Sequence, residues 1–166
     1  MIRQFIEMQK DLQKNMVQFR DRDNIDERGS AIAECIELSE ELGLVDTHKT
    51  WKIKPKCKKN AEKELVDIMF FITQLIMKLK YDSCEEILKG LEETISVGIE
   101  KRGTLELKEH LLALMNSISN TKGTMGAIFW NYGAVMGCMG VSPAELLGLY
   151  KEKYNENMVR EDFTRC

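Results

Sequence analysis

Two pairs of acidic residues, each three positions apart, are the part of this sequence best suited to chemistry. Glu34 and Glu37 form the first pair, and Glu64 and Asp67 form the second. Three residues is close to one helical turn, so the two acids of each pair would project from the same face of a helix. If the two helices packed side by side, carboxylates about 5 Å apart would repel each other by roughly 3 kcal/mol at an effective dielectric near 20. The pattern therefore predicts a positive partner between the helices.

A hard divalent cation is the partner that an all-oxygen set of Asp and Glu side chains suits best. Mg²⁺ binds few carboxylates and leaves positions for water and phosphate oxygens. A cluster of Glu34, Glu37, Glu64 and Asp67 would therefore suit such a cation. A single pair of this kind is usually only part of a solvated helix face. Here each pair borders an apolar stripe, which in the second segment runs through Leu65, Ile68, Met69, Ile72, Ile76 and Leu79.

A basic, tryptophan-bearing stretch separates the two acidic segments. Residues 44 to 58 show no helical period and contain Trp51 and Lys54 within the run Trp-Lys-Ile-Lys-Pro. We interpret this stretch as a binding loop. In the alternative interpretation, Trp51 fills the edge of the core and the lysines only balance the acids.

The last helical segment carries a second group of polar side chains. Lys153, Asn157 and Arg160 follow i, i+4, i+7 spacing, which places an ammonium, an amide and a guanidinium on one face. Such a set can bind phosphates and hydrogen-bond a base. The alternative is an exposed, charged terminal helix.

The composition predicts an all-α helical bundle built around the two acidic helices. Its 166 residues suit a single domain over 1–166, and Leu, Met, Glu and Lys are common while proline occurs only at Pro55 and Pro143. We predict helices over about 2–21, from soon after 26 to 43, 59–80, 83–98, 105–117, 123–139, and from 143 onward. Ser83 and Ser142 are the expected caps of the fourth and last of these helices. The segment 123–139 is apolar on more than one face, which suits burial or a homodimer interface.

Charge and cysteine content exclude several other classes of protein. A formal net charge of −3 argues against general nucleic-acid binding. The apolar runs are too short to span a membrane, and the N-terminus lacks a signal-peptide pattern. Five cysteines without a Cys-x-x-Cys motif indicate neither a disulfide framework nor a zinc site. These features favour a cytoplasmic protein.

In order and spacing, the motifs resemble those of the all-α dimeric dUTPases, particularly the shorter bacterial and phage branch. That family resembles the wider MazG-type nucleotide pyrophosphohydrolases. The matching segments are Met8-Gln9-Lys10-Asp11-Leu12, Glu34-x-x-Glu37 with Glu41, Trp51-Lys52-Ile53-Lys54-Pro55, Glu64-x-x-Asp67 and Lys153-x-x-x-Asn157-x-x-Arg160. The resemblance covers most of the chain. It implies a homodimer that hydrolyses dUTP to dUMP and pyrophosphate, with Mg²⁺ held by the four acids.

This resemblance also implies a role for each matching side chain. Glu34 or Glu37 would orient a water and take its proton, while Glu64 and Asp67 would mainly hold metal. No covalent intermediate is needed. The residues expected at the phosphates are Lys54, Lys153 and Arg160, those beside the base and deoxyribose are Trp51 and Phe71, and those at the uracil edge are Asn157 and Gln9.

Two positions depart from the family pattern. Phe70 stands where the family usually has His, and Arg160 is followed by Glu-Asp-Phe in place of the usual Gln and Gly-Tyr ending. The first departure leaves open a related pyrophosphohydrolase that acts on another nucleotide, such as dCTP or a modified pyrimidine. A second alternative is a helical regulatory or scaffold protein whose acids only keep two helices soluble.

Overall fold

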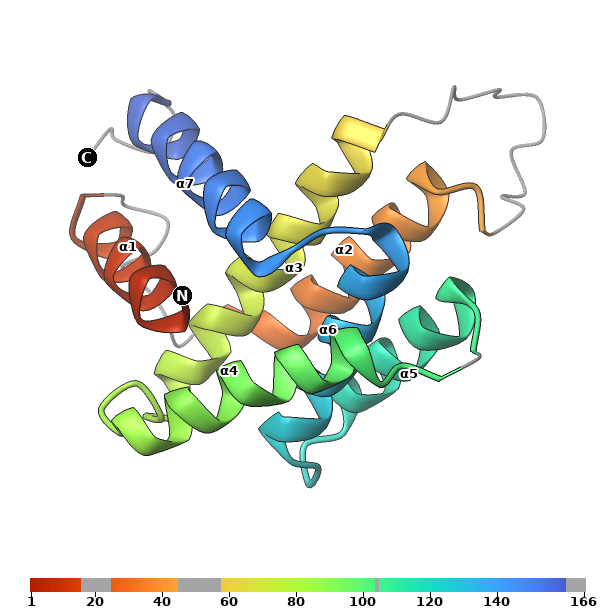
Figure 1. The fold of residues 1–166 in the computed structure, drawn as a ribbon. Helices are drawn as coiled ribbons and strands as arrows, with labels where there is room; N and C mark the ends of the chain where they lie inside the picture. The colour runs from red at the N-terminus through yellow and green to blue at the C-terminus, as the bar shows by residue number, and fades with distance from the viewer. Residues whose placement is uncertain (16–24, 45–57, 104, 161–166) are drawn as a thin grey trace.

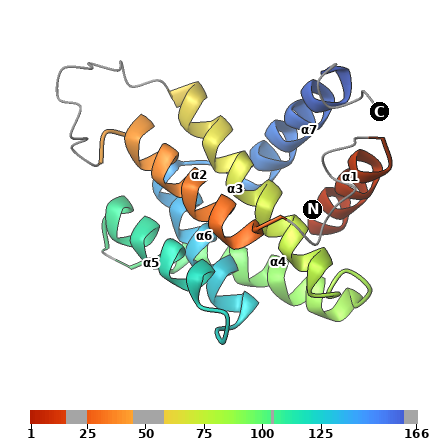
Figure 2. The same ribbon diagram turned by 180° about the vertical axis from the view of Figure 1, so that it is seen from behind.

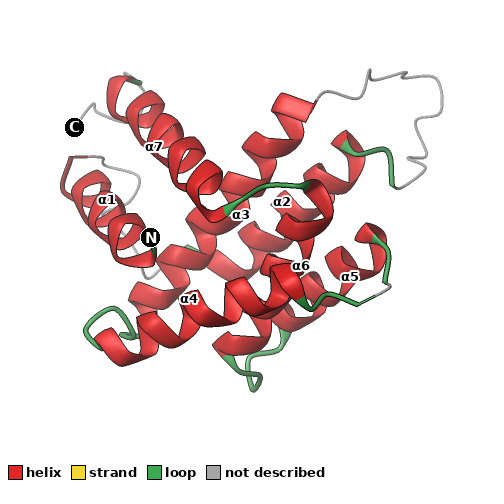
Figure 3. Ribbon diagram, in the orientation of Figure 1, coloured by secondary structure: helices red, strands yellow, loops and turns green. Residues whose placement is uncertain are grey.

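The computed structural model describes residues 1–15, 25–44, 58–103 and 105–160, and within these ranges it contains seven helices and no strands (Figures 1 and 3). The helices are α1 (Ile2–Asn15), α2 (Glu27–Glu41), α3 (Lys58–Lys78), α4 (Glu85–Glu100), α5 (Leu107–Ser119), α6 (Met125–Met139) and α7 (Pro143–Val159). The predicted all-α class is confirmed. The expected continuation of the first helix to residue 21 lies outside the described residues.

Helix α3 is the central element of the bundle. It runs between α2 on one side and α1 with α7 on the other, and two opposite views agree on this arrangement (Figures 1 and 2). The sequence accounts for this position, because apolar side chains occupy more than one face of the helix. Its fully buried side chains include Leu65, Val66, Ile68 and Met69. Polar groups on α3 therefore lie at the edges of helix contacts.

Helix α6 is covered inside a single chain. It packs against α4 and α5, and its side chains from Ile128 to Met136 are largely buried. Glycines allow the close approach to α4: a Cβ on Gly133 would lie 2.3 Å from the Ile95 carbonyl oxygen, and one on Gly98 would lie 2.2 Å from that of Trp130. Burial within the chain therefore explains the apolar pattern that had also suited a homodimer interface.

Two predicted helix ends are confirmed by their hydrogen bonds. Gly43 has φ +64° after α2, its N–H donates to the Glu40 carbonyl at 3.0 Å, and the Leu44 N–H donates to the Ser39 carbonyl at 2.9 Å. This is the Schellman arrangement that a glycine after the helix favours. At the start of α7 the Ser142 hydroxyl accepts a hydrogen bond from the Glu145 N–H at 3.1 Å.

The predicted cap of the fourth helix is wrong. Helix α4 begins at Glu85 with Cys84 as its N-cap, and no side-chain hydrogen bond caps it. The Ser83 hydroxyl instead donates to the Lys80 carbonyl at 3.4 Å, in the turn that follows α3. Lys80 itself has φ +62°, so the tight turn out of α3 determines where Ser83 lies.

No helix within the described ranges has the length and apolar character needed to cross a membrane.

Candidate active site

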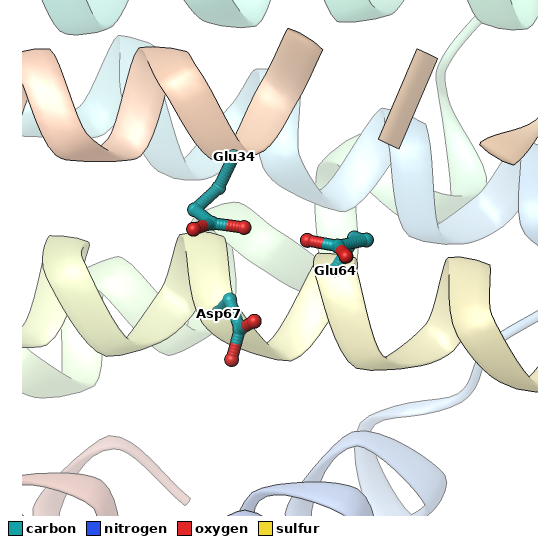
Figure 4. Close-up of side chains that lie close together, drawn as sticks. All are labelled: Glu34, Glu64 and Asp67. Atoms are coloured by element: carbon teal, nitrogen blue, oxygen red, sulfur yellow. The ribbon is translucent and has the colours of Figure 1, made fainter. Parts of the chain in front are cut away.

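Three of the four predicted acids meet between α2 and α3. One carboxylate oxygen each from Glu34, Glu64 and Asp67 lies within 4.8 Å of the others, and all three side chains are partly buried (Figure 4). Glu34 comes from α2, and the other two lie one turn apart on α3. These positions adjoin the apolar stripes through which the two helices pack, as the sequence pattern predicted. An all-carboxylate set of this kind is typical of sites for hard cations.

An ion pair fixes the relative position of α2 and α3 at one end. Lys78 Nζ, at the end of α3, lies 2.9 Å from Glu27 Oε2 at the start of α2. The same ammonium donates to the Ile25 carbonyl oxygen at 3.2 Å, and the Glu27 side chain is 5% exposed. The two helices are therefore antiparallel. Glu34 lies seven residues, or about two helical turns, further along α2, opposite the acids of α3.

The cluster contains more negative charge than its surroundings balance. Burial raises the pKa of Glu64 to about 8, together with a hydrogen bond to Glu34 and the negative charges of Glu34, Asp67 and Glu37. Burial also raises the pKa of Asp67, although the Lys153 ammonium opposes that shift. A carboxyl group that keeps its proton near neutral pH marks a place where a cation is favoured.

Glu37 lies outside the three-residue cluster. Its side chain is exposed, one turn further along α2, yet its charge contributes to the raised pKa of Glu64. The structure therefore separates the first acidic pair into one member within the cluster and one at its edge. Spacing within a single helix does not distinguish the two, because the difference depends on how α2 is rotated against α3.

Lys153 brings the last helix to the cluster. Its Nζ lies 3.0 Å from Asp67 Oδ1, with side chains that are 27% and 19% exposed. Asn157, one turn later, is buried. The helix ends at Val159, and Arg160 is its exposed C-cap with an extended backbone. Arg160 directly follows the last helical residue, and its place on the face of Lys153 and Asn157 stays a prediction.

The remaining predicted substrate contacts lie in different surroundings. Gln9 is fully buried, and its Nε2 donates to the Tyr150 hydroxyl at 3.1 Å. Phe71 is partly buried against the core. Trp51 and Lys54 lie outside the described residues.

Phe70, at the position where the family usually has His, belongs to an aromatic stack. Its ring lies 4.6 Å from that of Tyr150, and the other face of the stack is completed by Phe5 at 4.0 Å from Tyr150. Phe70 is 5% exposed. Phe70 therefore places an apolar ring in the core between α1, α3 and α7.

Sequence reasoning gave no role to two tyrosines of α7. Tyr150 combines the ring stack with a hydrogen bond from Gln9, and burial raises the pKa of its hydroxyl. The Tyr154 hydroxyl donates to Asp11 Oδ2 and so connects α7 to α1. The i, i+4 spacing of the two tyrosines is the signal in the sequence that places both on one face of the helix.

Comparison with known proteins gives a family match over nearly the whole chain. A family model described as dUTPase matches residues 1–163, which include every acid of the cluster and the whole of α7. No match is found among curated proteins. The match spans nearly the full chain, and the fold is all-α as in that family. The chain therefore belongs to the all-α dUTPase family.

Proposed function

We propose that this protein hydrolyses dUTP to dUMP and pyrophosphate with the help of Mg²⁺. The observation that carries the proposal is the cluster of Glu34, Glu64 and Asp67, whose oxygens lie within 4.8 Å of one another. Its all-oxygen donor set suits Mg²⁺, and burial together with the neighbouring acids raises the pKa of Glu64, so a bound cation is favoured there. The donor chemistry of these residues therefore fits the metal that the family implies.

The acids of the site divide into two roles in this proposal. Glu34, Glu64 and Asp67 would hold the metal, which when bound supplies neutralisation of phosphate charge and acidification of water. Glu37 is exposed beside the cluster, so its oxygens are open to a water that they can orient and deprotonate. Water attack of this kind needs no covalent intermediate on the protein.

The cations would bind the triphosphate. Lys153 pairs with Asp67 in the structure, and it can exchange this partner for a phosphate oxygen when metal occupies the carboxylates. Lys54 and Arg160 are proposed to contact the remaining phosphate oxygens, and Trp51 and Phe71 to flank the base and deoxyribose.

We also propose that the protein acts as a homodimer in the cytoplasm. An exposed groove between α2 and α5 supports the dimer, and Leu112 on its wall is 53% exposed. Ile36 on α2 is a further exposed apolar side chain, at 48%. Residues that line the groove include Ile32, Leu112 and Met115. A monomer in sedimentation velocity at micromolar concentration would contradict this part of the proposal.

Pyrophosphate release tests the central claim. The purified protein should hydrolyse dUTP in Mg²⁺ and not in EDTA, and Glu64→Gln should abolish turnover. Glu93→Gln removes an exposed carboxylate from α4 and is the matched control, which should keep full activity. Calorimetry with Mg²⁺ and a non-hydrolysable dUTP analogue measures binding independently of turnover. If the protein neither binds nor hydrolyses dUTP, the proposal is wrong and the regulatory alternative is favoured.

Phe70 favours one second candidate, a pyrophosphohydrolase for another pyrimidine nucleotide. Its buried ring in the stack with Tyr150 offers no polar contact to the sugar. The same assay with dCTP and modified pyrimidine nucleotides distinguishes this candidate, which requires one of them to be hydrolysed with higher kcat/KM than dUTP.

A further inference from the structure

A chain of hydrogen bonds runs through the buried contact of α1, α3 and α7. The Thr73 hydroxyl donates to the Met69 carbonyl oxygen at 2.7 Å, and the Tyr150 hydroxyl is hydrogen-bonded to the Thr73 side chain. Gln9 Nε2 donates to the Tyr150 hydroxyl at 3.1 Å, and Gln74 Nε2 donates to Gln9 Oε1 at 3.5 Å. The exposed fraction of Gln74 is 4%, and the side chains of Thr73, Tyr150 and Gln9 are fully buried.

The inner end of the chain fixes its direction. A backbone carbonyl only accepts hydrogen bonds, so Thr73 donates to Met69 and its oxygen can accept from Tyr150. The Tyr150 oxygen then accepts from the Gln9 amide nitrogen, and the Gln9 carbonyl accepts from Gln74. This sequence of donors orients both amide groups, which are otherwise hard to tell from their flipped forms. The hydrogen-bond chain therefore ends at the side-chain carbonyl oxygen of Gln74.

The free end of the chain is a buried acceptor without a donor. Among the described residues, Gln74 Oε1 has no hydrogen-bond partner, and the same is true of Gln13 Oε1 on α1. Buried polar atoms are nearly always paired, and an unpaired one costs free energy that a suitable donor recovers. The contact between α1 and α3 therefore has the chemistry to accept a ligand that carries N–H or O–H donors.

Gln74 lies on the same side of α3 as the acids. Asp67, Phe71 and Gln74 follow each other at helical spacing, and seven residues of α-helix rise about 10 Å. That distance is comparable to the separation between the phosphates and the base of an extended nucleotide. Phe71 lies between them, partly buried, at the level expected for the sugar.

We infer that Gln74 determines base specificity by accepting a hydrogen bond from N3–H of uracil. This inference rests on the proposed function. Cytosine carries a lone pair at N3, so two acceptors would face each other there and both would stay unpaired. A glutamine free to turn would satisfy either base, and the bonds through Gln9 and Tyr150 remove that freedom. Gln9 is then a positioning residue that acts through Gln74. Thymine also has N3–H, so Gln74 would not separate uracil from thymine.

A nucleotide panel with one substituted variant tests the inference. The parent and Gln74→Met are compared by kcat/KM for dUTP, dTTP and dCTP in Mg²⁺. Met keeps the length of the side chain and lacks the carbonyl. We expect the dUTP to dCTP ratio to fall by at least about 10-fold, with the dUTP to dTTP ratio unchanged. Gln4→Met, which makes the same change at an exposed position of α1, should leave both ratios as in the parent.

Tyr150→Phe supplies a second, independent variant. It keeps the rings stacked on Phe5 and Phe70 and removes the hydroxyl that orients Gln9. The dUTP to dCTP ratio should fall in the same direction by a smaller factor. This result decides the matter if Gln74→Met does not fold, and an unchanged ratio would then overturn the inference.

The outcomes separate this inference from the proposed function. A folded Gln74→Met that keeps the parent's dUTP to dCTP ratio overturns the role of Gln74 and leaves dUTP hydrolysis standing. If the parent hydrolyses dUTP and dCTP equally well, the role of Gln74 is also overturned and dUTP hydrolysis still stands. A parent that releases pyrophosphate from no nucleotide contradicts the proposed function itself.

Discussion

Replacing Glu64 by Gln should stabilise the metal-free protein in a pH-dependent manner. Glu64 keeps its proton in the folded state up to about pH 8, whereas the unfolded chain releases it near pH 4.5. Between these values the folded state binds more protons, so the stability of the parent falls as pH rises. Gln is neutral at every pH and does not show this loss. The stabilising effect of Glu64→Gln should therefore be small at pH 5, increase toward pH 8, and stay constant above it.

The size of the effect follows from the pKa shift after allowance for solvent. A shift from 4.5 to about 8 corresponds to at most about 5 kcal/mol if the full interaction is counted. Glu64 is only partly buried and solvent screens its neighbours, so we expect about 1 to 2 kcal/mol at pH 8.5. Urea unfolding in EDTA at pH 5.5 and 8.5 measures this difference directly. Glu93→Gln, on the exposed face of α4, is the control and should change stability little at either pH.

Added Mg²⁺ should reverse the order of the two proteins. A ligand that binds only the folded state stabilises it by mass action, and the parent retains all of its carboxylate ligands. At saturating Mg²⁺ and pH 8.5 the parent should therefore unfold at higher urea concentration than Glu64→Gln. If the variant is less stable than the parent in EDTA at pH 8.5, the carboxylate is not crowded by like charges and the reasoning about the cluster is wrong.

Three further changes test other parts of the molecule. Lys153→Met should raise KM for dUTP by about 10-fold or more through loss of a charge-assisted phosphate contact, measured by initial rates, and an unchanged KM would place Lys153 outside the site. Ser142→Ala should destabilise the protein by about 1 kcal/mol in urea unfolding, because it leaves the Glu145 N–H without its cap, and no loss of stability would contradict the capping role. Tyr132→Phe should destabilise by about 1 kcal/mol by removing its buried hydrogen bond to the Leu65 carbonyl, and unchanged stability by the same measurement would show that this bond does not stabilise the fold.

Local features of the sequence predicted the elements well. Helical period, the Schellman glycine at Gly43 and the Ser142 cap act over a few residues, so the chain pattern contains nearly all the information that they need. The prediction at Ser83 was wrong because of another local interaction. Its sequence fits a capping pattern, but the Ser83 hydroxyl donates to the Lys80 carbonyl in the turn out of α3 and does not cap α4.

The candidate site was predictable in composition and not in arrangement. Each acidic pair could be placed on one helical face, and the proximity of Glu34 to both acids of α3 followed from packing the two faces together. The exposure of Glu37 depends on the rotation of α2, which helical spacing does not specify. The pairing of Lys153 with Asp67 depends on where the last helix packs, and only the assembled core determines that.

The contact between α4 and α6 is connected to the helix that carries two of the acids. Gly98 and Gly133 leave no room for a side chain, so these two helices have a single allowed separation. Tyr132, next to Gly133, donates through its hydroxyl to the carbonyl of Leu65 at 2.7 Å, and Leu65 adjoins Glu64 in the sequence. Adding a methyl group at either glycine should therefore push α4 and α6 apart. Through the Tyr132 hydrogen bond, this would shift the Glu64 carboxylate, which the methyl group does not contact. A search for inactive variants should therefore recover substitutions at these glycines as well as at the acids.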